Sequence, residues 1–222
     1  GQRDPDLRHR VDVLRGGRPP PGADVDARAM AQVRRTAQLL QRRLPRASAK
    51  PATHPDPDRA AGLLLGFAYP DRIGLSRGDA ETGRYLLANG RGAVLPGPAS
   101  LGRSEFIVAA DIDAGEREAR VHLGAPLDRA TLERHFSDRI VTQDEVAWDV
   151  RIEAVVARRV RRLDALVLEE RALGAAAGER ARDAMIEGIR AMGLASLPWT
   201  SELQQWRARV ALLRAHASSP EE

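Results

Sequence analysis

The sequence has no cysteine and few aromatic residues, and each shortage excludes a class of protein. Without cysteine among its 222 residues, the chain cannot be a disulfide scaffold, a zinc ribbon, a thiol redox protein or a cysteine-nucleophile enzyme. Aromatic residues make up only 4%, so a core must be built mainly of Leu, Val, Ile and Ala. Hydrophobic residues reach 43%, which is enough for a folded core and argues against a disordered tail.

The chain also has only one lysine and no long apolar run. Lys50 is followed by Pro51 and has no glycine-rich approach, whereas a P-loop needs Gly-x4-Gly-Lys-Ser/Thr. ATP hydrolysis by a P-loop in this chain is therefore excluded. The longest apolar stretch, residues 60–68, is far shorter than the ~20 residues of a membrane span, so no membrane partner is expected. The chain shows no signal-peptide pattern and no initiator Met, which favours a cytoplasmic protein and a piece of a longer one.

Positive charge is concentrated at the two ends of the chain. The 35 basic and 31 acidic residues give a net charge of +4, and all basic residues except Lys50 are arginine. Residues 1–60 carry a net charge of +6, residues 61–150 carry −4 and residues 151–222 carry +2. The arginine excess is explained either by a compositional bias of the genome or by phosphate recognition, to which the guanidinium fork is suited. Any surface for a polyanion is expected to involve the ends.

The first 70 residues predict a small bundle of about three helices. Leu7, Val11 and Leu14 form a short apolar stripe, and residues 56–69 read as a short apolar helix that is capped by Asp56 and halted by Pro70. Between them, one longer apolar stripe at helical spacing comprises Met30, Val33, Ala37, Leu40 and Leu44. A proline-rich loop over residues 45–57 separates the second and third helices.

From Gly83 onward the apolar period changes from 3.6 to about 2, which predicts strands. Five or six short strands follow, with one helix, capped by Asp128, inserted after the third. A small closed barrel of the OB type has this count. Helices return after residue 172, and Ser201 with Gln204 forms a capping box for the last of them. The predicted fold is therefore α+β: a small helical bundle, then an OB-like β-barrel and C-terminal helices.

These patterns set the predicted boundaries of the chain's parts. The helical bundle is expected at residues 1–70, a linker at 71–82, the barrel at 83–172 and the C-terminal helices at 173–222.

Several motifs that suggest catalysis lack the context that the chemistry needs. Gly74-Leu75-Ser76-Arg77-Gly78 fits the Gly-x-Ser-x-Gly elbow of hydrolases, but it has no apolar strand before it and no helix after it, so a polar linker is the better interpretation. Asp144-Glu145 resembles a Walker B pair, yet without a P-loop it reads as exposed acids at a strand end. No two of the five histidines have the i, i+4 spacing of a metal site, so no metal is expected.

Two arginine clusters are the candidate nucleic-acid-binding residues. The first comprises Arg158, Arg159, Arg161 and Arg162 on a late strand, where alternate residues face opposite sides. It is either a phosphate-tracking strip or a salt-bridged barrel wall that uses Glu153, Asp164 or Glu169. The second cluster comprises Arg84, Tyr85, Asn89 and Arg91, in which the tyrosine either stacks on a base or belongs to the core.

The order of several motifs resembles the C-terminal half of HrpB-type ATP-dependent RNA helicases, the bacterial branch of the DEAH-box family. Two long motifs carry the resemblance first, at residues 68–73 (AYPDRI) and 83–93 (GRYLLANGRGA). Shorter ones follow in the same order at residues 144–149, 155–159, 166–170 and 197–200. The resemblance extends from about residue 5 to residue 215.

The resemblance implies an auxiliary region of a larger helicase. Such a parent has two RecA-like motor domains, a winged helix, a helical bundle, an OB-like barrel and a C-terminal extension, and this chain would hold the end of the bundle, the barrel and the start of the extension. ATP and Mg²⁺ would then belong to the motor, with no cofactor and no catalytic residue in this chain. The implied partners are single-stranded RNA or DNA and the motor domains of the parent.

Two other functions remain open from the residues alone. A protein-interaction module that docks a partner or regulator would use Trp199 and Trp206, which lie on or beside the last helix and can form an apolar patch. A stand-alone hydrolase would use Ser76, and labelling by a serine-directed probe would reveal it.

Overall fold

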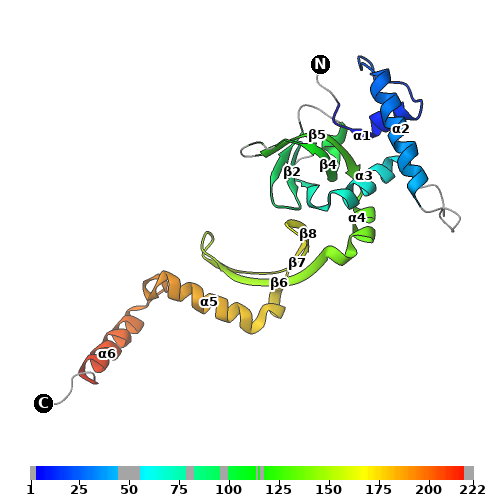
Figure 1. Cartoon of the computed structure of the whole chain (residues 1–222). Coiled ribbons are helices and arrows are strands. Elements are labelled where there is room, and N and C mark those ends of the chain that lie inside the picture. Colours follow the sequence, from blue (N-terminus) through cyan, green and yellow to red (C-terminus); the bar gives the residue numbers. More distant parts are fainter. Residues whose placement is uncertain are drawn as a thin grey trace. The chain divides into compact units, whose positions relative to one another are not determined.

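The computed structural model describes residues 4–44, 56–78, 83–95, 100–113, 115 and 118–217. The chain divides into two compact units (Figure 1). The first contains residues 1–141 and 161–169, and the second contains residues 142–160 and 170–222. Most of the proline-rich loop (residues 45–55) and the end of the expected linker (residues 79–82) lie outside the described residues.

Three helices open the first unit, as the apolar stripes predict. They are α1 (Leu7–Leu14), α2 (Ala27–Arg43) and α3 (Pro57–Ala68). Each begins directly after an aspartate whose side chain accepts a hydrogen bond from a backbone N–H of the first turn. These caps are Asp6, Asp26 and Asp56, and they satisfy donors that a helix start otherwise leaves unpaired.

The helices pack differently from a bundle that buries its apolar stripes together. The stripe of α2 stays exposed, with Val33 at 48%, Leu40 at 57% and Leu44 at 68%. Instead, α3 packs on the rest of the first unit through two buried glycines. A Cβ atom on Gly62 would lie 1.9 Å from the carbonyl oxygen of Pro126, and one on Gly66 would lie 2.8 Å from Phe136 Cζ. The three helices are thus confirmed. The apolar stripe of α2, however, is not buried against any other part of the chain that the structure describes.

Five strands form a closed barrel in the first unit. They are β1 (Ile73–Ser76), β2 (Arg84–Leu87), β3 (Gly92–Val94), β4 (Phe106–Ile112) and β5 (Glu118–Leu127). Around the barrel the order is β1-β2-β3-β5-β4, with β3 and β5 parallel and all other pairs antiparallel. The α+β class with a barrel is confirmed, while the OB-like character of this barrel stays a prediction.

The barrel begins and ends earlier than the sequence predicts. β1 falls inside the stretch expected to be a linker. Ile73 of this strand is fully buried, and the side chains of Leu87 and Tyr85 pack closely against Gly74. The helix that was expected after the third strand is α4 (Arg129–His135), and it follows the fifth strand. The last three strands, β6 (Ile140–Asp149), β7 (Ala154–Leu163) and β8 (Leu166–Ala172), form a separate sheet.

Two buried apolar clusters form the core of the first unit. One joins Phe106, Leu132 and Phe136 with side chains at the β7–β8 turn, such as Leu163. The other fills the barrel around Tyr85, Leu101 and further aliphatic side chains. Most of the buried side chains are Leu, Val, Ile and Ala, as the low aromatic content requires.

In the second unit, two helices follow the strands. They are α5 (Gly178–Met192) and α6 (Ser201–Ala217). The buried positions of α5 are the small residues Ala184 and Gly188, and a Cβ atom on Gly188 would lie 2.1 Å from the ring of Trp148. The larger side chain of Met185, on the same helix, is 49% exposed. Thr200 rather than Ser201 caps α6, because its Oγ1 accepts from the backbone N–H of Leu203 at 3.3 Å.

Short 3₁₀ turns complete the described structure, at Pro70–Arg72, Ser100–Arg103, Ser137–Arg139, Gly174–Ala177 and Leu194–Ser196. Of the helices described, none is long and apolar enough to cross a membrane.

Candidate nucleic-acid interface

The arginines at the start of the β7 cluster are held in ion pairs with neighbouring strands. Arg158 lies 2.9 Å from Glu145 on β6 and 2.9 Å from Glu170 on β8. Its neighbour Arg159 lies 2.7 Å from Asp144. The same carboxylate also forms an ion pair with Arg180 on α5, at 3.1 Å. Three arginines therefore face three carboxylates, and their formal charges cancel.

The electrostatics of this group match a network in which every group is charged. Hydrogen bonds from Arg159 and then from Arg180 lower the pKa of Asp144 to about 2. The hydrogen bonds to Glu170 and Glu145 raise the pKa of Arg158, and the bond to Asp144 raises that of Arg159. A phosphate that binds here has to displace a carboxylate first. These ion pairs agree with the salt bridges of the alternative interpretation, but they lie in the separate sheet of β6, β7 and β8 and not in a barrel wall.

The rest of the β7 cluster lies with the first unit. Arg161 lies 3.4 Å from both Glu133 on α4 and Glu169 on β8. Arg162 is half-buried. Of the acids expected from the sequence, Glu169 is therefore a partner of this cluster.

The other two expected acids are placed differently. Asp164 pairs with Arg139, and Glu153 lies in the β6–β7 turn with a positive φ of 50°. The actual partners could have been found from the spacing of opposite charges. Asp144 and Glu145 pair with Arg159 and Arg158 in reverse order, as facing positions of an antiparallel hairpin do.

The second cluster lies on the β2–β3 hairpin of the barrel and is much less neutralised. Arg84 is 60% exposed and meets Glu118 at 3.4 Å. Asn89 and Arg91 are exposed in the turn, where Asn89 Oδ1 accepts from the backbone N–H of Arg91 at 3.0 Å. The Arg91 guanidinium reaches the carbonyl oxygen of Gly115 at 3.4 Å. Both arginines therefore reach toward the start of β5.

Strand pairing adds one arginine that the sequence analysis missed. Arg84 pairs with Val94 on β3, and Val94 pairs with Arg120 on β5. Paired residues on neighbouring strands point to the same side, so Arg84 and Arg120 share the outer face of the barrel, about 10 Å apart across two strand spacings. Arg120 could not be found from local sequence because it depends on a parallel pairing between strands that are distant in the chain.

Tyr85 is not a stacking residue in this structure, which corrects the expectation for this position. Its side chain is fully buried in the barrel. The hydroxyl lies 3.1 Å from the carbonyl oxygen of Leu101 and 2.9 Å from that of Ser104, and burial raises its pKa to about 12. The exposed tyrosine is Tyr69, at 38%, with the Arg72 guanidinium 4.7 Å from its ring centroid.

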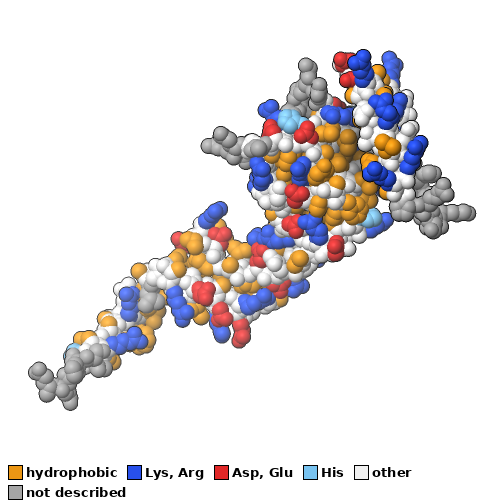
Figure 2. All heavy atoms as spheres, viewed as in Figure 1, with side chains coloured by type: hydrophobic (Ala, Val, Ile, Leu, Met, Phe, Trp, Pro, Cys, Tyr) orange, Lys and Arg blue, Asp and Glu red, His pale blue; other side chains and the backbone are white. Residues whose placement is uncertain are grey.

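Beside Tyr69, other apolar side chains of α3 are also exposed. Phe67 is 55% exposed and its ring centroid lies 5.2 Å from that of Phe136. Leu64 is 67% exposed. Figure 2 shows hydrophobic side chains gathered on the first unit in the region of α3. In the described part of the first unit, the aromatic rings that bases can reach therefore lie at the end of α3 and not inside the barrel.

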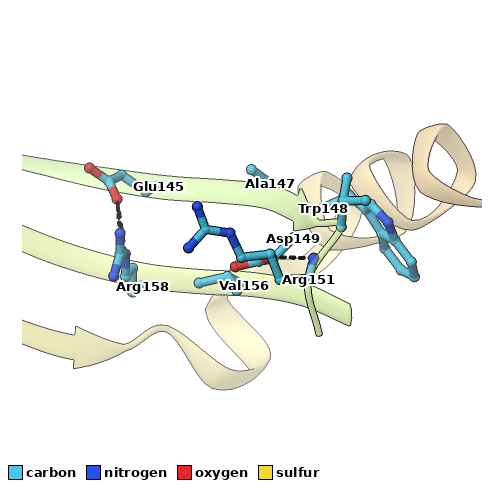
Figure 3. Close-up of a pocket in the computed structure, with 8 residues that line it drawn as sticks. Glu145, Ala147, Trp148, Asp149, Arg151, Val156 and Arg158 are labelled. Carbon is cyan, nitrogen blue, oxygen red and sulfur yellow. Dashed lines mark hydrogen bonds and ion pairs between the residues drawn. The ribbon is translucent and has the colours of Figure 1, made fainter. Parts of the chain in front are cut away.

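A shallow cavity of about 450 Å³ lies on the β6–β7 hairpin (Figure 3). Its lining includes the Glu145–Arg158 ion pair, together with Asp149 and Arg151. Figure 3 shows the Trp148 side chain turned away from the strands toward a helix, which agrees with its contact at Gly188. Because the lining mixes acids and arginines, this cavity offers no preference for an anion.

The remaining catalytic motifs carry no site in the described residues. Ser76 lies within β1, opposite Tyr85 on β2, and not on a strand-to-helix turn. Asp144 and Glu145 serve the ion pairs of β7. Among the residues that the structure describes, no group of His, Asp and Glu is arranged to hold a metal ion.

Comparisons with known proteins agree on one family. Residues 139–173 match the family model described as the connector region of the ATP-dependent RNA helicase HrpB. The ATP-dependent RNA helicase HrpB of Escherichia coli strain K12 is 34% identical over 149 residues, which are 66% of this chain and 18% of that protein. The chain therefore spans about one fifth of the length of this curated relative.

Solved structures give the same result. The crystal structure of the E. coli DExH-box NTPase HrpB aligns with a TM-score of 0.53 and 26% identity, covering 96% of this chain and 27% of that one. The crystal structure of the E. coli DEAH/RHA helicase HrpB aligns with a TM-score of 0.51 and 27% identity, covering 90% and 25%. The resemblance to HrpB-type ATP-dependent RNA helicases is thus confirmed, and the chain corresponds to a connector and auxiliary region of such a protein.

Proposed function

We propose that this chain contributes to single-stranded nucleic-acid binding in its parent RNA helicase and supports the motor domains of that parent. The similarity to HrpB supports the helicase context. The observation that carries the binding role is the exposed group of arginines on the barrel, Arg84, Arg91 and Arg120, of which only Arg84 has a carboxylate partner among the described residues.

The mechanism is neutralisation of phosphates together with stacking of bases. Guanidinium groups on β2, on the β2–β3 turn and on β5 would follow the backbone of a single strand, and release of its counterions would favour binding. Asn89 shapes the turn that presents Arg91. Tyr69, with Arg72 over its ring, provides a surface on which a base can stack.

The arginines of β7 enter this proposal only as secondary contacts. Arg158, Arg159 and Arg161 each have carboxylate partners that a phosphate would have to replace. That exchange offsets most of the gain from a new contact. ATP and Mg²⁺, which the resemblance assigns to the motor domains, have no binding motif in this chain, and no step of the proposal involves them.

The test is fluorescence anisotropy of a labelled single-stranded RNA with the whole chain over a salt series. Micromolar binding that weakens steeply with salt is expected. Replacing Arg84, Arg91 and Arg120 by Gln should lower the slope of log K against log salt by about 2, since each phosphate contact to a single strand contributes about 0.7. Replacement of the exposed arginines Arg182, Arg190 and Arg209 by Gln is the matched control, with the same change of net charge. Absence of binding at low salt would refute the proposal.

A protein-interaction module is the second candidate, and α6 is the observation that favours it. Trp206 is 63% exposed, and Leu212 and Leu213 are exposed at 61% and 69%. An apolar helix surface of this kind is typical of a docking site. The motor domains of the parent, expressed separately, should then bind the chain and lose binding on Trp206→Ala, while the variant keeps any RNA affinity.

A further inference from the structure

Helix α2 carries the largest net charge among the helices and strands that the structure describes. Its 17 residues include no Asp or Glu and five arginines: Arg28, Arg34, Arg35, Arg42 and Arg43. Every residue of the helix except Met30 is exposed. Within the described part of the chain, none of the five arginines pairs with a carboxylate. Figure 2 shows blue side chains of basic residues in the region of the helix labelled α2 in Figure 1.

Three of these arginines form a straight line on the helix. Arg28, Arg35 and Arg42 are spaced by seven residues, and seven residues are nearly two turns of an α-helix. Their Cα atoms therefore follow the helix axis at intervals of about 10 Å. We call these three residues the α2 arginine line. Among the residues that the structure describes, the side chains of Arg28 and Arg42 make no hydrogen bond or ion pair, and Arg35 donates only to the neutral Gln32 at 2.7 Å.

A different arginine fixes the helix in place. The Arg34 guanidinium donates from Nε and Nη2 to the carbonyl oxygen of Leu14, at 3.1 and 2.9 Å. That carbonyl belongs to the last turn of α1, where a helix leaves its acceptors unpaired. Arg34 is thus a structural contact to α1, which leaves the arginine line free on another side of α2.

The charge and geometry of α2 select the class of ligand. The exposed apolar stripe, which includes Val33 and Leu40, lies on the side of the helix opposite the arginine line. A protein groove that covers the stripe therefore cannot reach the line. A row of cations without acids between them is complementary to anions that repeat along one direction, which describes a nucleic-acid backbone.

We propose that the α2 arginine line is a binding site for the phosphate backbone of single-stranded RNA, separate from the arginines of the barrel. This inference rests on the proposed function, because it assigns a second contact surface for the same ligand. Phosphates of the strand would pair with Arg28, Arg35 and Arg42 in succession. The site would contact phosphates and not bases, so its contribution to affinity is independent of RNA sequence.

The test uses the whole chain and oligouridine in a salt series. The triple variant Arg28→Gln, Arg35→Gln and Arg42→Gln keeps Arg34 and the helix caps, and circular dichroism confirms that the helix content is unchanged. We expect affinity at 0.1 M salt to fall by roughly tenfold or more, and the salt slope to fall by about 2. The same three residues changed to Lys should retain most of the slope. The control Arg182→Gln, Arg190→Gln and Arg209→Gln has the same net charge and should bind as the wild type does.

Each outcome decides between the inference and the proposed function. If the wild type binds RNA and the α2 triple variant has the same slope as the control, the inference is wrong and the proposed function stands. If the wild type does not bind RNA at any salt concentration, both fail. If polyglutamate of equal length competes as well as oligouridine does, the line serves an acidic protein surface, which also overturns the inference.

Discussion

The arginines of β7 and those of α2 show how differently one residue type is used in the same chain. On β7, Arg158, Arg159 and Arg161 meet carboxylates at 2.7 to 3.4 Å, and the charges around Arg158 and Arg159 cancel. On α2, no acid occurs in 17 residues and the arginines remain exposed. The denser cluster in the sequence is therefore the more neutral surface.

The difference comes from where the acids fall when the chain folds. A β-hairpin brings residues from two strands face to face, so acids more than ten positions away neutralise β7. A helix brings together only residues three or four positions apart, and α2 has no acid at that spacing. A run of arginines indicates a binding surface only when the neighbouring element supplies no opposite charge.

The largest effect is expected where a predicted binding residue is really part of the core. Tyr85→Ala should lower the free energy of unfolding by about 3–5 kcal/mol, because it removes a fully buried ring from the barrel. Chemical denaturation measures this loss. Tyr85→Phe keeps the ring and should cost about 1 kcal/mol, from the lost hydroxyl hydrogen bond. A stable Tyr85→Ala protein with weakened RNA binding would restore the stacking role.

The exposed tyrosine should behave in the opposite way. Tyr69→Ala is expected to cost clearly less stability than Tyr85→Ala, since Tyr69 is 38% exposed, and to weaken RNA binding by roughly fivefold. Tyr69→Phe retains an aromatic face and should bind RNA as the wild type does. Anisotropy and denaturation of the same samples separate the two effects. Equal RNA affinity for the Ala and Phe variants would remove Tyr69 from the site.

A smaller effect is expected on the neutralised strand. The double variant Arg158→Ala and Arg159→Ala should change RNA affinity by less than about threefold, because both guanidinium groups are already paired. Its melting temperature should fall slightly, since exposed ion pairs contribute little to stability. A loss of RNA affinity as large as that of the α2 triple variant would show that the ion pairs open for phosphate, and would break the comparison.

The smallest effect is a dependence of stability on acid. The pKa of Asp144 is about 2 in the folded chain, against an ordinary value of 3.8, so its ion pairs stabilise the fold above pH 4. This contribution is lost as the pH falls from about 4 to 2. The difference in melting temperature between wild type and Asp144→Asn should therefore shrink over that range. A constant difference down to pH 2 would contradict the pairing of Asp144 with Arg159 and Arg180.

Local features of the fold could be predicted from the sequence, whereas long-range pairings could not. Apolar spacing identified α1, α2 and α3, and the capping aspartate Asp56 marked the start of α3, because both signals lie within a few residues. The position of β1 was missed, since Gly74 and Ser76 read as a polar linker until β2 and β4 pair with them. The contact between Gly188 and Trp148 was missed because glycine gives no signal in an apolar stripe.

In the candidate site, too, only the neighbours within one hairpin could be predicted from the sequence. Arg84, Asn89 and Arg91 lie together because they share one hairpin. Arg120 joins them only through the parallel pairing of β3 and β5. The two tyrosines could not be told apart by residue type, since burial of Tyr85 depends on closure of the barrel around it.

We expect RNA to contact the exposed arginines of α2 and of the barrel, and not the neutralised arginines of β7. Arginine footprinting tests it most directly: the chain is treated with phenylglyoxal with and without oligouridine, and modified residues are identified by mass spectrometry. We expect RNA to protect Arg28, Arg35 and Arg42 together with Arg84, Arg91 and Arg120. Arg158 and Arg159 should react slowly in both samples. RNA-dependent protection confined to Arg158, Arg159, Arg161 and Arg162 would contradict the account.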